Sequence, residues 1–164
     1  MPYAMAMRTR FMALAIALSV PAMAGAEAPA SQGLTMFDRL VGRCYIANVG
    51  PYSTDRHCFE GIYGRKHLRD RHSVTVDGKV VYAGETIYSR DGDTIVFTYF
   101  NTLGGVGHGK ASAAPGGIAF TGSMRGTPNG TVQSMDSKWR WQASGYAASD
   151  GKGADVVFKP VAAK

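Results

Sequence analysis

Pairs of turn-forming residues recur along the chain at nearly constant intervals, and this spacing constrains the fold more than any other feature. Five such pairs lie 12 to 14 residues apart: Asp77-Gly78, Asp91-Gly92, Gly104-Gly105, Gly116-Gly117 and Asn129-Gly130. Segments of this length between tight turns suit β-strands joined as hairpins. No helix-length amphipathic pattern follows Arg43. The sequence therefore predicts an all-β protein.

Strands joined in order by tight turns form an antiparallel meander, and a curled meander hides its edges by closing into a barrel. We expect an up-and-down barrel of about 8–10 strands. A β-sandwich is less favoured because its crossovers need longer connections. Before the strands, Leu34, Phe37, Leu40 and Val41 recur at helical spacing and Gly42 supplies a stop, which predicts one short N-terminal helix.

The clearest hairpin is expected over residues 79–101, around a two-residue turn at Asp91-Gly92. Counting outward from that turn gives the pairs Arg90–Asp93, Tyr88–Ile95, Thr86–Phe97, Gly84–Tyr99, Ile87–Val96 and Glu85–Thr98. Gly84 would leave room for the Tyr99 ring above the backbone. A three-residue loop is the alternative, and it would slip the register by one residue and mix the two faces.

The same counting through Asp77-Gly78 adds the preceding strand and places Asp70 opposite Glu85 and His72 opposite Ala83. We expect the more aliphatic face inside, with the residues Leu68, Asp70, His72, Val74, Val81, Ala83, Glu85, Ile87, Val96 and Phe100. The outer face then carries His67, Arg69, Arg71, Ser73, Tyr82, Thr86, Tyr88, Ile95, Phe97 and Tyr99. The opposite arrangement stays open, since a barrel that binds an anion could turn the arginines inward.

A later hairpin around Asn129-Gly130 places Phe120 opposite Trp139 and Ile118 opposite Trp141. Lys138, Arg140 and Gln142 would point the other way. The two indoles are interpreted first as barrel core, because small barrels fill their interiors with side chains. The alternative is that they line a ligand cavity.

The first 26 residues have the features of an export signal. Arg8 and Arg10 precede the apolar run 11–20, and Ala22-Met23-Ala24 or Ala24-Gly25-Ala26 offers a cleavage site. The run is shorter than the roughly 20 residues that span a bilayer. We expect a signal peptide (1–26), a disordered leader (27–33) and a barrel domain (34–164), located in the bacterial periplasm or secreted. An uncleaved anchor is the alternative.

Removal of that signal leaves 16 Lys and Arg against 12 Asp and Glu, a net charge of +4 instead of +6. These basic residues are scattered, without a Lys/Arg run or an RNP-like motif. Nucleic acid is therefore not an expected partner. The remaining chain of about 138 residues is large enough for a single core. Its oligomeric state stays open.

Two cysteines, Cys44 and Cys58, lie on what we expect to be the first two strands. In an exported protein they are expected to form a disulfide, which would close a loop of about 15 residues and contribute about 3 kcal/mol to stability. Two free thiols are the alternative. A redox function is not expected, because the chain has no Cys-x-x-Cys motif.

The most distinctive group of polar residues on the expected inner face consists of Asp70, Glu85 and His72. Two facing carboxylates would raise the pKa of one of them, which suits acid–base catalysis or the binding of a polar ligand group. The favoured interpretation is a different one. These side chains would form a solvent-exposed row on the outer wall, or the two carboxylates would be neutralised by nearby arginines. The four histidines show no metal-ligand spacing, so no metal site is expected.

The order of these elements resembles that of uncharacterised bacterial lipocalin-like (calycin-type) β-barrel proteins. The resemblance covers residues 34–160 and rests on Gly84-Glu85-Thr86, Tyr88, Tyr99-Phe100-Asn101, Gly104-Gly105 and Trp139. It implies a closed antiparallel barrel with a short helix at one end. Haem-binding barrels of similar shape use a histidine near the C-terminus, and none follows His108. No cofactor is therefore expected.

The function expected first is the binding of a small amphipathic or hydrophobic ligand inside an exported barrel. The expected ligand-binding residues are Glu85, Tyr99, Phe120, Trp139 and Trp141. The second hypothesis is an envelope interaction or structural protein with a filled barrel, presenting Arg69, Arg71 and neighbouring tyrosines to a partner. The third is an enzyme that uses Asp70, Glu85 and His72.

Overall fold

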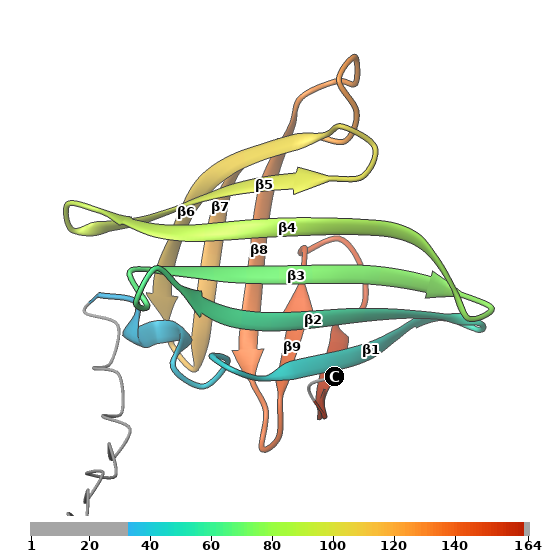
Figure 1. The fold of residues 1–164 in the computed structure, drawn as a ribbon, viewed down its shortest axis with the longest axis horizontal. Coiled ribbons are helices and arrows are strands. Elements are labelled where there is room, and N and C mark those ends of the chain that lie inside the picture. The colour runs from blue at the N-terminus through green and yellow to red at the C-terminus, as the bar shows by residue number, and fades with distance from the viewer. Residues whose placement is uncertain (1–32, 163–164) are drawn as a thin grey trace, which may run out of the picture.

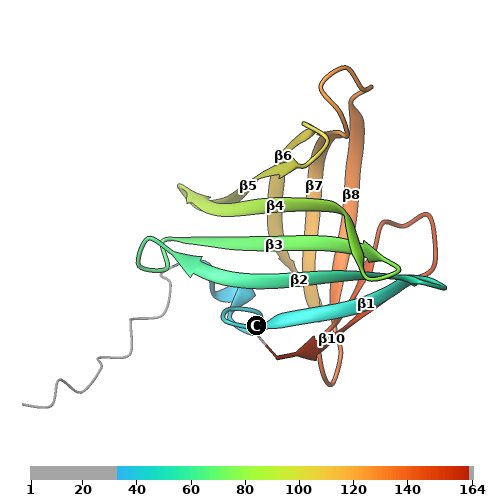
Figure 2. The same cartoon turned by 45° about the vertical axis from the view of Figure 1, so that its right-hand side comes forward.

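A computed structural model describes residues 33–162, so the expected signal peptide (1–26) and all but the last residue of the expected leader (27–33) lie outside the described residues. The described chain forms ten antiparallel strands that close into a barrel (Figures 1 and 2). Each strand pairs with its neighbours in sequence, and β1 pairs with β10 to close the barrel. The predicted all-β antiparallel barrel is confirmed.

The strands are β1 (Cys44–Gly50), β2 (Ser53–Ile62), β3 (His67–Val76), β4 (Lys79–Asp91), β5 (Thr94–Asn101), β6 (Val106–Ala114), β7 (Gly117–Arg125), β8 (Gln133–Trp141), β9 (Tyr146–Ser149) and β10 (Val156–Val161). In Figure 1, β2, β3 and β4 run across the view, whereas β7 and β8 behind them run steeply. The two walls therefore cross, as the tilted and twisted strands of a closed barrel must.

Residues 33–43, which precede β1, cover one end of the barrel (Figure 1). Among these described residues the only regular structure is a single 3₁₀ turn, η1 (Thr35–Phe37), where the sequence predicts a short helix. Gly33 and Gly42, both at positive φ, bound this stretch, and the residues between them form only short turns. The helical spacing nevertheless identifies buried residues correctly: Leu34, Phe37 and Leu40 are each at most 2% exposed.

Within the described part of the chain, no helix has the length and apolar character needed to cross a membrane.

The hairpin of β3 and β4 begins in the predicted register and then departs from it. Val76 pairs with Lys79 and Thr75 with Val80, but Val74 pairs with Tyr82 because a β-bulge leaves Val81 as the extra residue. A bulge of this kind shifts the register by one, which exchanges the two faces of the strand. Every pair predicted beyond the bulge is therefore wrong.

The bulge changes which side chains of β4 face the interior. Asp70 pairs with Thr86, and Arg71 pairs with Glu85 on the outer wall. The expected face of β3 is correct, since Leu68 and Asp70 are 1% and 2% exposed. On β4 and β5, the inner residues are Tyr82, Gly84, Thr86, Tyr88, Ile95, Phe97 and Tyr99. The expected inward positions of Val81, Ala83, Glu85, Ile87, Val96 and Phe100 are wrong.

Two other hairpins depart from the predicted register without exchanging faces. Between β4 and β5, Asp91 pairs with Thr94, so the turn is Gly92-Asp93 and Tyr88 faces Phe97. Between β7 and β8, Ile118 pairs with Trp139, because a loop over residues 126–132 replaces the predicted two-residue turn. Both shifts are by two residues, and an even shift keeps each side chain on its face.

The disulfide between Cys44 and Cys58 is confirmed, and it joins residues paired across β1 and β2. The neighbouring cross-strand pair, Tyr45 and His57, points into the barrel. Because successive side chains alternate between faces, the disulfide lies on the outer wall.

Candidate functional site

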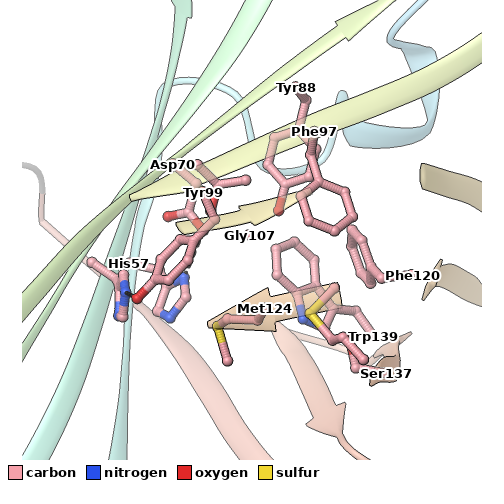
Figure 3. A pocket seen from close by; sticks show the side chains of 13 residues that line it. His57, Asp70, Tyr88, Phe97, Tyr99, Gly107, Phe120, Met124, Ser137 and Trp139 are labelled. Atoms are coloured by element: carbon pink, nitrogen blue, oxygen red, sulfur yellow. Dashed lines mark hydrogen bonds and ion pairs between the residues drawn. The ribbon is translucent and has the colours of Figure 1, made fainter. Parts of the chain in front are cut away.

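The barrel interior contains a cavity of about 180 Å³. Figure 3 shows its two chemically different sides: aromatic rings, among them Phe97, Phe120 and Trp139, gather on one side, and His57, Asp70 and Tyr99 lie on the other. A cavity built in this way suits a molecule with one apolar and one polar part.

The apolar side is formed by aromatic residues from β4, β5, β7 and β8 that pack on one another. The ring centroids of Phe120 and Trp139 are 4.6 Å apart, and those of Phe97 and Phe120 are 6.3 Å apart. Tyr88 extends the row, with its ring 6.1 Å from that of Phe97. Met124 and Met135 complete this side and add flexible thioether groups that adapt to irregular shapes.

The polar side is a continuous chain of hydrogen bonds, here called the polar chain. Its members in order are Asp70, His57, Asp55, His72, Tyr99 and Tyr82. Nδ1 of His57 lies 2.8 Å from Asp70 Oδ2, and its Nε2 lies 3.4 Å from Asp55 Oδ2. Nδ1 of His72 lies 3.4 Å from Asp55 Oδ1, and its Nε2 lies 3.2 Å from the Tyr99 hydroxyl. A hydrogen bond between the hydroxyls of Tyr99 and Tyr82 ends the chain.

Four members of the polar chain come from two identical tripeptides. Asp55-Arg56-His57 lies on β2 and Asp70-Arg71-His72 on β3, and the strands pair so that His57 faces His72. Alternation sends the aspartate and histidine of each tripeptide inward and the arginine outward. The antiparallel register then brings each histidine next to the aspartate of the other tripeptide.

Gly84 makes the contact between His72 and Tyr99 possible. It pairs with His72 across β3 and β4. A Cβ atom at this position would collide with Nε2 of His72 and would lie 2.7 Å from the Tyr99 hydroxyl. The expectation that Gly84 leaves room for the Tyr99 ring is therefore correct, although its strand partner is Asn101 and not Tyr99.

The carboxyl groups of the polar chain keep His57 protonated. Burial alone would lower the pKa of His57, but the attraction of Asp70 and the hydrogen bonds with Asp55 and Asp70 outweigh it and raise that pKa to about 10. Burial would likewise raise the pKa of Asp55, but hydrogen bonds with His57 and His72 hold it well below its usual value. Burial, with the hydrogen bond to Tyr82, raises the pKa of Tyr99. At neutral pH the centre of the chain is an imidazolium–carboxylate pair.

Two buried oxygen atoms near this chain have no hydrogen-bond partner among the described residues. They are Oδ1 of Asp70, which is 2% exposed as a residue, and the hydroxyl of Tyr146, which is 0% exposed. Asp70 lines the cavity, but its unpaired oxygen has almost no accessible surface, so the carboxyl group has to turn before that oxygen can contact a bound molecule. A buried polar atom of this kind costs free energy until it receives a partner.

A second hollow of about 400 Å³ adjoins the first and shares His57, Ser137 and Trp139 with it. Asp55 lines this second hollow, together with residues of the loop between β9 and β10 such as Gly153. The imidazole of His57 therefore lies between two cavities and can be reached from either.

The structure separates the residues that the sequence analysis groups as ligand-binding. Tyr99, Phe120 and Trp139 line the cavity. Trp141 does not: it packs beside the core, with the Arg39 guanidinium 5.2 Å from the centre of its ring. Glu85 points away from the barrel, 3.9 Å from Arg69, so its expected place in the interior is wrong.

The catalytic candidates are divided in the same way. Asp70 and His72 lie inside and belong to one hydrogen-bonded chain, but Glu85 is on the outer wall. The carboxylate pair that motivates the enzyme hypothesis therefore does not form.

The surface proposed for a partner also changes. Arg69 and Arg71 are on the outer wall beside Glu60, whereas the tyrosines expected next to them face the interior.

Three members of the polar chain are missed by the sequence analysis: Asp55, His57 and Tyr82. The repeated tripeptide Asp-Arg-His is the sequence signal that identifies two of them, because on adjacent strands it places two imidazoles and two carboxyl groups on one face. No comparable signal marks Tyr82, whose inward position depends on the bulge at Val81.

No protein-family model matches this chain, and a search of curated proteins finds no match either.

Proposed function

We propose that this protein is an exported barrel that binds a small amphipathic molecule, with the apolar part of the ligand against the aromatic side of the cavity and a hydrogen-bond donor at Asp70. The observation that carries the proposal is the free Oδ1 of Asp70, a buried carboxyl oxygen beside an aromatic cavity. A ligand with a protonated amine supplies the missing donor as a charge-assisted hydrogen bond.

The charges around the two hollows favour a cationic group over an anionic one. Asp55 and Asp70 contribute carboxyl groups, and none of the described residues that line either hollow is a lysine or an arginine. The imidazolium of His57 is already engaged by Asp70 and Asp55. Aromatic rings add to this preference because their faces attract cations.

The size of the cavity limits the ligand. An apolar cavity of roughly 150 Å³ accepts one benzene molecule, so the 180 Å³ here suits a single ring with a short polar chain. The adjoining hollow gives such a molecule a place to extend or to enter.

Export is the other part of the proposal. It rests on the sequence features of residues 1–26 and on the disulfide between Cys44 and Cys58, since disulfides persist mainly in oxidising compartments.

Three probes with the same ring and chain test the ligand class: 2-phenylethylamine, 2-phenylethanol and phenylacetate. We expect calorimetric titration to rank the amine first and phenylacetate last, with a difference of about tenfold or more between them, because a charge-assisted hydrogen bond contributes roughly 1.5–3 kcal/mol. Equal or tighter binding of phenylacetate would contradict the assigned polarity. Absence of binding by all three would contradict the cavity as a site for ligands of this size.

Ser137→Phe and Ser134→Phe provide a matched pair of variants on β8. Ser137 lines both hollows, whereas Ser134 is exposed on the outer face. We expect the first substitution to fill the cavity and abolish amine binding, and the second to leave binding unchanged. Circular dichroism and melting temperature verify that both variants fold.

A further inference from the structure

The centre of the polar chain has the composition of a metal site. Asp55, His57 and His72 each offer one ligand atom, and these three atoms lie within 4.8 Å of one another. The three side chains are only 14–17% exposed and face the interior from β2 and β3.

The hydrogen bonds of Asp55 inside this group are long, and their lengths match the spacing between two ligand atoms of one ion. Asp55 lies 3.4 Å from each imidazole, through a different carboxyl oxygen in each case. Charge-assisted hydrogen bonds are usually about 2.7–2.9 Å long. Two ligand atoms that each lie about 2.1 Å from a tetrahedral zinc ion are about 3.4 Å apart. Each carboxyl oxygen is therefore at the separation from one histidine that a shared ion would impose, so an ion between the two imidazoles would face both oxygens of Asp55.

The second nitrogen of each ring is held by a group outside this trio. Nδ1 of His57 contacts Asp70 at 2.8 Å, which leaves Nε2 for an ion. Nε2 of His72 contacts the Tyr99 hydroxyl at 3.2 Å, which leaves Nδ1. Metal-binding histidines almost always donate their other N–H to a carboxylate, carbonyl or water, which fixes the ring orientation. Asp70 is the acceptor for His57. The Tyr99 hydroxyl, itself hydrogen-bonded to Tyr82, is the acceptor for His72.

We propose that Asp55, His57 and His72 bind one divalent transition-metal ion, and the type of the three ligands identifies this ion as zinc. Two imidazoles with one carboxylate suit zinc, whereas calcium and magnesium prefer oxygen ligands alone. The ion takes the place of the proton through which His57 Nε2 binds Asp55.

Three protein ligands leave at least one coordination position for water or a ligand group. That position opens toward the cavities, since His57 lines both hollows, His72 the first and Asp55 the second. An open position is characteristic of a site that exchanges its fourth ligand, not of a closed structural site.

The first test is titration of the full-length, oxidised and chelator-treated protein with zinc chloride, followed by calorimetry. We expect saturation at one equivalent. His72→Gln and Asp55→Asn are each expected to weaken binding at least about tenfold. The matched control is His108→Gln, since His108 is exposed on β6 and follows the cavity-lining Gly107. Binding that is absent in the unmodified protein, or that is lost only with His108→Gln, would overturn the proposal.

The second test needs no substitution and therefore does not depend on how the variants fold. Nitrogen NMR of the imidazole rings, with and without zinc, is expected to show the ion on Nε2 of His57 and on Nδ1 of His72. Zinc on the opposite nitrogens, or on His67 or His108, would refute the assigned geometry.

The proposed zinc site shares Asp55 and His57 with the residues that give the cavity its preference for a cation, so the two ligands are tested separately. The amine titration is carried out in the presence of a chelator, and the zinc titration without any amine, so failure of one leaves the other result intact.

Discussion

Tyr146 and Tyr45 offer a paired test of how the barrel interior treats hydroxyl groups. Their rings pack edge to face with centroids 5.3 Å apart, and they are 0% and 3% exposed. The Tyr45 hydroxyl donates to the carbonyl oxygen of Arg39 at 2.9 Å, whereas the Tyr146 hydroxyl has no partner among the described residues. Replacing each tyrosine with phenylalanine removes one oxygen from nearly the same surroundings.

The two substitutions are expected to change stability in opposite directions. Leaving a buried polar group unsatisfied costs about 1–3 kcal/mol, so Tyr146→Phe should stabilise the barrel by about 1 kcal/mol or more. Tyr45→Phe removes a hydrogen bond with a net contribution of about 0.5–1.5 kcal/mol and should destabilise it by that amount. For a domain of this size, 1 kcal/mol corresponds to a shift of about 4 °C in melting temperature.

Urea unfolding followed by tryptophan fluorescence measures both changes, provided that the slopes of the free energy against urea stay equal. The difference between the two variants should be about 2 kcal/mol, being the sum of the two opposite effects. Destabilisation of Tyr146→Phe by as much as Tyr45→Phe would refute the reasoning, because it would show that the Tyr146 hydroxyl makes a favourable interaction.

Two further predictions concern stability. Removing the disulfide with Cys44→Ala and Cys58→Ala should lower the free energy of unfolding by about 3 kcal/mol, since its loop spans 14 positions; an unchanged urea midpoint would contradict this. Burial, with a smaller effect from Asp70, raises the pKa of Tyr88 and Tyr146 above the ordinary 10.0. The unfolded chain therefore loses these protons at a lower pH than the folded chain does. The stability that this pKa difference provides is complete below pH 10 and disappears as the pH rises further. Alkaline titration should show late tyrosinate absorbance that appears together with unfolding, and ionisation of all tyrosines without unfolding would contradict the assignment.

Much of the fold can be predicted from this sequence because its turn signals are local. The repeated glycine turns determine a meander of short strands, and alternation then places Phe120, Ile118 and Trp139 on a common face even where the predicted register is two residues off. The helical spacing of Leu34, Phe37 and Leu40 likewise identifies buried residues, although only a 3₁₀ turn forms there.

The candidate site could be predicted only in part, because its composition depends on one extra residue. Val81 bulges out of β4, and this turns Tyr82 inward and Glu85 outward. The bulge keeps Glu85 out of an interior that already holds the carboxyl groups of Asp55 and Asp70, and burying another charge there would be costly. No pattern of alternating residues reveals such a bulge in advance, since both registers satisfy the turn at Asp77-Gly78.

The sequence by itself determines the strands and their order, and it places Asp70 and His72 on one face of a strand, because turns and alternation are properties of neighbouring residues. The tertiary structure decides which strand faces meet across the barrel, and hence that His57, rather than Glu85, joins Asp70 and His72. The physical reason is that register and closure are set by packing and charge burial over the whole interior, which no single segment encodes.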